Sequence, residues 1–409
     1  MSFWCRERAG WLAALILPAF AATGQAQQLY FQPQAEIGVE DDTNRNLVPS
    51  GDHIDKRGNS AGYSVDAIGI AGIATPLTDT TIRPEVSYAD YPHLGTDDLR
   101  TLLDLNSAFH SERGQGDIEG RFDRESTTSS ELANPLFNLV NPNLPTTPET
   151  GRVTTNTTRT LFMAVPTYTF DLSQRLNWGV QGTYQNVGYS GSNAGAYIPF
   201  EYYLGGTSLG WNATPRFGVA FGAFASRESA KNGSGSVDAA GGTVTFDYKW
   251  STQVVSHLQV SGERDDSSVV KPIEFKNTNT GIGATYSTTW TGQISKLQLT
   301  LGRTFTPSGA GGTFRADQLQ IEYMRDLTQR LALTAAARVI NETSLSRAYL
   351  NGDYNYVNFE TRLKWKLTPV WYVAGGVQYL HEHFEPPVGA AANAMLYASF
   401  GYLGLGKPQ

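Results

Sequence analysis

The sequence of 409 residues predicts an all-β fold: a transmembrane antiparallel β-barrel of about 18 strands, with 16 strands as the alternative. Three observations lead to this prediction. Polar and apolar residues alternate over segments of about 10 to 14 residues, a length that crosses a membrane at a tilt. A tight turn recurs about every 40 residues, the period of a hairpin with its loops. Most tryptophans lie beside those turns. Such a barrel has short periplasmic turns and longer extracellular loops.

The composition excludes several other classes. The chain is 40% hydrophobic and 17% charged, and its mean hydropathy is -0.31, too polar for a bundle of transmembrane helices. One cysteine excludes a disulfide framework, and 11% aromatic residues argue against disorder. The net charge of -7 gives no basic surface for nucleic acid, so we expect no nucleic-acid partner. With 42 glycines, the composition favours one large β-structure over two or three soluble domains.

The first 26 residues are expected to be a signal peptide. Arg6 and Arg8 precede the short apolar segment Ala9 to Ala22, and Gly24-Gln25-Ala26 forms a small-x-small cleavage site. An uncleaved anchor is the alternative. The predicted division is therefore a signal peptide at 1–26 and a single outer-membrane barrel at 27–409. Cys5 would leave with the signal peptide, and the mature chain would contain no cysteine.

Alternation identifies the strands. In the segment Val244 to Trp250, even positions are apolar or aromatic and odd positions are polar. The segments 176–185, 296–301, 319–323 and 357–366 follow the same rule. Because successive strand side chains point to opposite faces, each segment has one apolar and one polar face.

The tight turns resemble one another. Asp171-Leu172-Ser173-Gln174-Arg175-Leu176 is nearly repeated as Asp326-Leu327-Thr328-Gln329-Arg330-Leu331. A spacing of about 40 residues fits two strands, one tight turn and one longer loop. A β-propeller has a similar period, but each of its blades uses four strands rather than two.

Tryptophan placement favours a membrane barrel over a soluble sandwich, in which tryptophan belongs in the middle of a strand. In a transmembrane barrel, tryptophan collects at the interfaces with the lipid headgroups. The predicted interfacial girdle consists of Trp178, Trp211, Trp250, Trp290, Trp365 and Trp371.

Charged residues on the polar strand faces are the candidate lining of a hydrated lumen, where mixed charge would set selectivity. The alternative is that they form cross-strand pairs that only brace the wall. Arg362, Lys364 and Lys366 form the densest basic strip, a candidate contact for an anionic solute or simply a solvated rim. The full set of lumen-lining candidates is Asp104, Glu119, Arg121, Asp123, Asp247, Lys249, Glu322, Arg338, Glu360, Arg362, Lys364 and Lys366.

Small residues also alternate on two strands and favour an open lumen. On the segments 216–226 and 330–340, the positions expected to face inward are mostly glycine, alanine and threonine. Phe224 and Arg338, also inward, would narrow the passage. The Pro-rich loop Ser129 to Thr154 either folds into the lumen as a constriction or is disordered outside the cell.

No metal, cofactor or catalytic site is predicted. Glu40, Asp41 and Asp42, with Asp52 and Asp55, give the first loop an acidic character, but their spacing is not that of an EF-hand. His381-Glu382-His383 is expected at a loop mouth and lacks a third ligand. The chain contains no Gly-x-Ser-x-Gly elbow, and no Ser and His pair stands out. We therefore expect that the protein is not an enzyme.

A family resemblance rests on several segments. They are Glu40 to Asn44, Arg124 to Leu132, Pro166 to Phe170 and Tyr184 to Ser190. The most specific is Arg124-Glu125-Ser126-Thr127-Thr128-Ser129-Ser130-Glu131-Leu132. The chain resembles the porin-2-like outer-membrane β-barrel proteins associated with exopolysaccharide and PEP-CTERM (exosortase) systems. The resemblance implies an outer-membrane barrel that serves polysaccharide secretion, and it supplies no catalytic residues. One departure is the polar ending Gly404 to Gln409, where barrel proteins often end on an aromatic residue.

The sequence therefore predicts a channel or export-assisting barrel for hydrophilic solutes in the bacterial outer membrane, with polysaccharide secretion as the role that the resemblance implies. Its expected partners are outer-membrane lipid, the solute and periplasmic secretion components. Two alternatives stay open. One is a structural or surface-interaction barrel with a filled lumen, and the other is a general diffusion porin.

Overall fold

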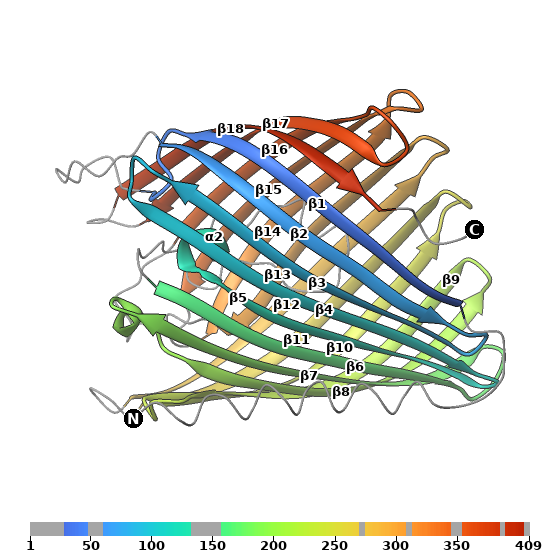
Figure 1. Cartoon of the computed structure of the whole chain (residues 1–409). Coiled ribbons are helices and arrows are strands. Elements are labelled where there is room, and N and C mark those ends of the chain that lie inside the picture. Colours follow the sequence, from blue (N-terminus) through green and yellow to red (C-terminus); the bar gives the residue numbers. More distant parts are fainter. Residues whose placement is uncertain are drawn as a thin grey trace.

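Eighteen strands form one closed antiparallel sheet in the computed structural model (Figure 1). The structure describes residues 28–47, 60–131, 157–269, 275–307, 313–344, 354–384 and 389–404. The strands are β1 (Gln28–Asp42), β2 (Ser60–Ala74), β3 (Thr78–Tyr91), β4 (Thr96–Ser111), β5 (Gly114–Ser126), β6 (Thr157–Asp171), β7 (Leu176–Gly191), β8 (Phe200–Thr214), β9 (Phe217–Ala230), β10 (Gly235–Lys249), β11 (Val254–Val269), β12 (Phe275–Thr291), β13 (Ser295–Pro307), β14 (Thr313–Asp326), β15 (Leu331–Ser344), β16 (Tyr354–Lys366), β17 (Trp371–Phe384) and β18 (Gly389–Leu403).

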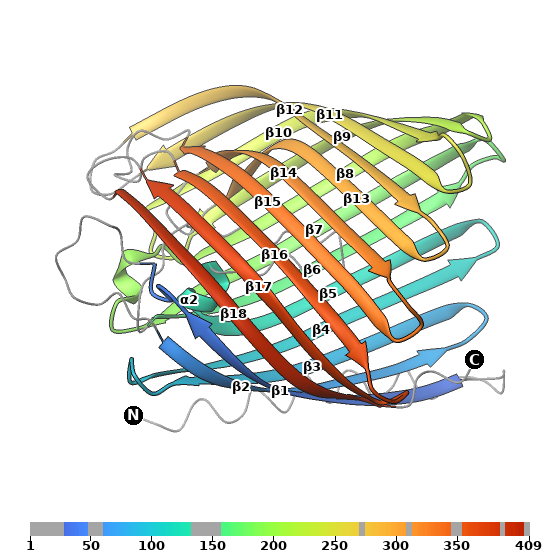
Figure 2. The same cartoon turned by 90° about the horizontal axis from the view of Figure 1, so that it is seen from above.

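Closure is made by the first and last strands. Every strand pairs with its neighbours in sequence, and β1 pairs with both β2 and β18, so that Glu36 lies opposite Asp66 on one side and Gly401 on the other. The prediction of 18 strands is confirmed, and the alternative of 16 is wrong. Figures 1 and 2 show the strands tilted across the wall, as closure of a sheet requires.

Tight turns gather at one end of the barrel, which we call the turn rim, and the longer connections gather at the other, the loop rim. At the turn rim the Ser173 hydroxyl accepts the backbone N–H of Leu176 at 3.1 Å. Thr328 does the same for Leu331 at 3.0 Å, and Thr368 for Trp371 at 3.0 Å. The recurring turn sequence is therefore a recurring side-chain cap, which holds the turn without a partner from elsewhere.

The two faces of the wall differ as the alternation predicts. Phe221, Ile282 and Leu396 are 60%, 72% and 62% exposed on the outer face. The alternate residues point inward, and Arg338 and Glu360 among them are 2% and 1% exposed. Because lipid satisfies no backbone hydrogen bonds, a spanning sheet must close on itself. A closed, even-stranded antiparallel barrel with an apolar outer face is a bacterial outer-membrane protein, with its turn rim facing the periplasm.

Helical structure is minor in the described residues. It consists of α2 (Thr127–Glu131) and the 3-10 turn η3 (Ala194–Ala196). Figures 1 and 2 both place α2 within the outline of the barrel at the loop rim. Ser129 of α2 donates to the carboxylate of Asp98, an inward residue of β4.

No helix in the described part of the chain has the length and apolar character needed to span a membrane.

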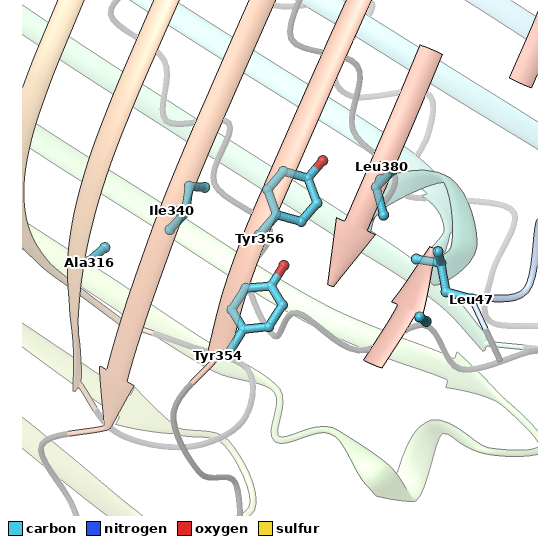
Figure 3. Close-up of a cluster of buried hydrophobic side chains, with 7 residues drawn as sticks. Leu47, Ala316, Ile340, Tyr354, Tyr356 and Leu380 are labelled. Atoms are coloured by element: carbon cyan, nitrogen blue, oxygen red, sulfur yellow. The ribbon is translucent and has the colours of Figure 1, made fainter. Parts of the chain in front are cut away.

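An apolar cluster covers the inner wall near the loop rim (Figure 3). Ile340 and Tyr356 are both 0% exposed, and Leu380 is 1% exposed. Leu47, from the segment after β1, joins them, so this segment turns inward over β14 to β18. The remaining members of the cluster are Ala316, Tyr354 and Ala391. This side of the barrel is filled, and it narrows the lumen.

Two neighbouring pairs of strands have short ladders. In one, β1 pairs with β18 only from Gln34 to Asp42. The other is β12 with β13. β12 extends over 17 residues, but its pairing with β13 includes only Ala284 to Thr291, opposite Lys296 to Arg303. The other partner of β12, β11, is paired along its whole length from Val254 to Val269. We call the stretch from Phe275 to Gly283, where the ladder with β13 is absent among the described residues, the β12–β13 seam. It lies in the half of the wall nearest the loop rim.

Candidate functional site: the barrel lumen

The lumen wall contains the lumen-lining candidates. The strand register places every one of them on the same face as the buried residues Glu360 and Arg338, and therefore inward. Contact of these residues with a solute stays a prediction. The inward set is Asp104, Glu119, Arg121, Asp123, Asp247, Lys249, Glu322, Arg338, Glu360, Arg362, Lys364 and Lys366.

Strands β3 to β6 carry a dense network of ion pairs. Arg100 lies 3.2 Å from Glu125, 3.5 Å from Asp123 and 3.9 Å from Glu85. Arg159 lies 2.7 Å from Glu125 and 3.8 Å from Asp123. Arg83 lies 2.7 Å from Glu85, and Arg121 lies 2.8 Å from Asp104. We call these inward residues of β3 to β6 the paired wall.

The segment after β1 adds a cation to this network. Arg45 lies 3.4 Å from Glu40, 3.5 Å from Asp42 and 3.8 Å from Asp98 of β4. Its guanidinium carbon also lies 3.7 Å from the centre of the Tyr91 ring. One arginine thus joins the segment after β1 to the paired wall. This role was not predicted from the sequence, because Glu40 and Asp42 were taken for residues of the first loop.

The basic strip on β16 is partly neutralised. Arg362 forms an ion pair with Glu36 of β1 at 2.8 Å, and the Tyr372 hydroxyl donates to the same carboxylate. Lys364 lies 3.7 Å from the centre of the Tyr372 ring. Lys366 is exposed at the turn rim. The strip therefore offers a solute less positive charge than its sequence indicates.

Strands β8 to β13 present a wall of a different kind. Its inward residues are mostly glycine, alanine, serine and threonine, and most of them are only half-buried. The register aligns them into a continuous strip between the two rims. We call this the small wall. Its members include Gly218, Ala220, Gly222, Thr243, Thr245, Ser261, Gly283, Thr285, Ser287, Thr300 and Gly302.

Three acidic residues interrupt the small wall near the loop rim and were also missed from the sequence. Glu228 of β9 and Glu263 and Asp265 of β11 point inward, and Asp265 is 4% exposed. Glu263 was not singled out. Glu228 and Asp265 fall in the segments 227–238 and 264–273, whose content of Gly, Ser, Asn and Asp indicated loops.

The six tryptophans of the predicted girdle all lie on the outer face beside the turn rim. Their exposed fractions run from 36% for Trp290 to 61% for Trp250. The indole nitrogen of Trp178 donates to Thr207 at 2.8 Å, and that of Trp250 donates to Ser256 at 2.9 Å. Contact of this band with lipid headgroups stays a prediction.

His381-Glu382-His383 lies at the loop-rim end of β17, beside the loop mouth where it was expected. These residues belong to the strand itself, which extends to Phe384. Glu382 points inward and is 1% exposed, whereas the two histidines point to the opposite face. Glu40 and Asp42 likewise belong to β1.

The described residues contain no group of three metal-ligating side chains close enough to hold a metal ion. The predicted signal peptide, Asp52, Asp55 and most of the loop Ser129 to Thr154 lie outside the described residues.

Comparison with known proteins gives structural matches only. No family model and no curated protein matches the chain. It is similar to OccK2 (OpdF) of Pseudomonas aeruginosa, solved with glucuronate, at 9% identity, 92% and 98% coverage of the two chains and a TM-score of 0.46. It is also similar to OccAB3 of Acinetobacter baumannii, at 10% identity, 92% coverage of this chain, 99% coverage of OccAB3 and a TM-score of 0.44. A third match is the ferric citrate transporter FecA, at 11% identity, 89% coverage of this chain and a TM-score of 0.43. The chain spans only 61% of the length of that transporter.

Proposed function

We propose that this outer-membrane barrel is a channel whose lumen passes hydrophilic solutes. The observation that carries the proposal is the small wall. Along β8 to β13, side chains such as those of Gly222, Thr245 and Ser261 leave room beside them and offer hydroxyl groups to water. A barrel of this strand number encloses an aqueous lumen unless side chains or loops fill it. The passage follows the small wall, which borders the filled wall of β14 to β18.

Cysteine labelling during single-channel recording in planar bilayers tests this proposal. Ser261→Cys puts a thiol on the small wall in a chain whose only natural cysteine, Cys5, lies in the predicted signal peptide. A negatively charged methanethiosulfonate reagent should then reduce the conductance. The matched control is Val260→Cys, one residue away on the outer face and 37% exposed in the natural protein, which should conduct unchanged after labelling.

A filled barrel is the second candidate. The burial of Tyr356 and Asn358 at 0% and of Glu360 at 1%, all inward on β16, favours it. A protein that inserts into the bilayer but shows no conductance, or one in which the Ser261→Cys channel ignores the reagent, would replace the channel proposal with a structural or surface-interaction role.

For the natural solute we propose a secreted polysaccharide, passed on by periplasmic secretion components. Support comes from the sequence resemblance to porin-2-like proteins of exopolysaccharide systems and from the hydroxyl groups of the small wall, which suit a sugar chain. Deleting the gene in its host should trap polymer inside the cell envelope. A general diffusion porin would instead leave secretion normal and slow the uptake of small solutes. Purified protein should hydrolyse neither lipid nor glycan.

A further inference from the structure

A recess of about 210 Å³ lies in the wall over β7 to β13. Most of its lining faces inward, and at the β12–β13 seam it also reaches Ala284, Arg303 and Phe305, whose strand positions face outward. Three of its lining residues are acidic and three are aromatic, and we call these six the acidic recess. They are Tyr202, Phe224, Glu228, Glu263, Asp265 and Phe305. The recess interrupts the small wall, so a solute that follows that wall meets it.

Two carboxylates of the recess are available to a ligand. Glu263 and Asp265 lie two residues apart on the same face of β11, which separates their Cα atoms by about 6.8 Å. Asp265 is 4% exposed. Within the part of the chain that the structure describes, neither carboxylate has a hydrogen-bond or ion-pair partner. Burial of an uncompensated carboxylate is unfavourable, and a cation in the recess would relieve it.

The nearby arginines are turned away. Arg227, Arg264 and Arg303 stand on the outer face, because each occupies the alternate position of its strand. There they pair with outer-face aspartates, at 3.7 Å for Asp238, 3.3 Å for Asp266 and 2.5 Å for Asp317. Arg303 also borders the recess, but two of its guanidinium nitrogens are bonded to Asp317, at 2.5 and 2.9 Å.

Aromatic rings flank Glu263 on both sides. Its neighbours across the sheet are Gly241 and Gly281. A Cβ atom at Gly241 would lie 2.6 Å from the ring of Phe224, and one at Gly281 would lie 2.3 Å from the ring of Phe305. The two rings therefore cover these glycines and border the carboxylate. A ring face and a carboxylate together favour an ammonium group, which gains from both.

We propose that the acidic recess binds aliphatic amines, organic cations with one or more ammonium groups, and so makes the channel prefer them. The inference rests on the proposed function, because the solute reaches the recess through the lumen. A metal ion is the less suitable occupant, since the three carboxylates are not grouped closely enough to share one among the described residues.

Isothermal titration calorimetry of the full-length protein in detergent tests the binding. The probe is 1,4-diaminobutane, and 1,4-butanediol is its uncharged counterpart. The diamine should bind and the diol should not. The double variant Glu263→Gln and Asp265→Asn should weaken diamine binding about tenfold, as expected for the loss of charge-assisted hydrogen bonds.

The matched control is Asp266→Asn. It removes the same carboxylate from the next position of β11, where the side chain lies on the outer face and is 55% exposed. The control should bind the diamine as the natural protein does. Phe224→Leu gives a second variant, which keeps both charges and removes one ring, and it should weaken binding severalfold.

Bilayer recording separates this inference from the proposed function. Diamine binding without any conductance would overturn the channel and leave the recess standing. Conductance with equal diamine affinity in the natural protein and in the double variant would overturn the recess and leave the channel standing. Equal binding of the diol and the diamine would also overturn the recess.

Discussion

The paired wall and the acidic recess are built from the same residue types on the same sheet, yet they present opposite electrostatic surfaces. On β3 to β6, arginines and carboxylates occupy alternate strands at the same level, so Arg121 lies opposite Asp104 and Arg159 opposite Glu125. On β11, Arg264 stands between Glu263 and Asp265 in sequence and therefore points the other way. A shift of one residue along a strand moves a side chain to the other face of the wall. That shift decides whether an arginine pairs with the inward carboxylates or leaves them facing a solute.

The pairing also determines where binding energy is available. In the paired wall, each carboxylate is already compensated, and a solute would have to compete with an arginine for it. In the acidic recess, Glu263 and Asp265 have no such partner among the described residues, and a bound cation would supply their counter-charge.

Replacing Arg100 should damage the paired wall most. Arg100→Ala leaves Glu85, Asp123 and Glu125 without their shared cation, and it should lower the free energy of unfolding by about 3 kcal/mol. Denaturant unfolding of the barrel folded in lipid vesicles measures this. Arg264→Ala on the outer face, where the side chain is 65% exposed, should cost less than about 1 kcal/mol. Equal losses in the two variants would contradict the contrast.

Filling the space beneath the Phe305 ring should cause the next largest loss of stability. Gly281→Ala would place a Cβ atom 2.3 Å from the Phe305 ring, which must move. We expect a loss of about 1–3 kcal/mol in stability and weaker diamine binding. Gly205→Ala is the control, because an added Cβ atom there has no neighbour within 4 Å. Unchanged diamine affinity in Gly281→Ala would show that the Phe305 ring does not contribute to diamine binding.

A double-mutant cycle should distinguish the two regions by their coupling. Arg121 and Asp104 are joined by two hydrogen bonds, at 2.8 and 3.3 Å. Their coupling energy in unfolding should be about 1–2 kcal/mol. The cycle between Arg303 and Glu263 should give less than about 0.5 kcal/mol, because the arginine is bonded to Asp317 instead. A coupling as large as that of the first pair would show that the recess is internally compensated.

Neutralising the two carboxylates of the recess should have the smallest effect on the free energy of unfolding. Unlike the Arg100→Ala and Gly281→Ala variants, this variant should be more stable than the natural protein. Glu263→Gln with Asp265→Asn removes two like charges on one strand face, and should raise the free energy of unfolding by at most about 1 kcal/mol. Glu125→Gln in the paired wall should lower it, because Arg100 and Arg159 lose a partner. Destabilisation of both variants in the same denaturant experiment would show that the recess carboxylates are compensated in the natural protein.

The fold could be predicted from local sequence because its signals are local. Alternation assigns the face of each residue, and the capped turns around Ser173 and Thr328 mark every second hairpin connection. For the same reason, the twelve inward candidates and the outward tryptophans were assigned to the correct faces. The ends of strands were harder to place, and β11 was ended too early because Arg264 to Ser268 is polar on both faces.

The partners of the charged residues could not be predicted from sequence. Arg362 reaches Glu36, which is 326 positions away in the chain and becomes its neighbour only when β18 pairs with β1. The basic strip therefore looked more positive than it is. In the same way, the contact of Arg45 with Asp98 depends on the path of the chain after β1, which alternation does not encode.

The β12–β13 seam is one of two places, with the β1–β18 closure, where neighbouring strands of the barrel share few backbone hydrogen bonds. From Phe275 to Gly283, β12 has a ladder with β11 only, among the described strands. Its backbone amides on that side should exchange with deuterium faster than those of β11. Ile282, 72% exposed on the outer face, lies in this seam. Separation of β12 from β13 there would widen the wall beside Phe305, and the acidic recess would widen with it.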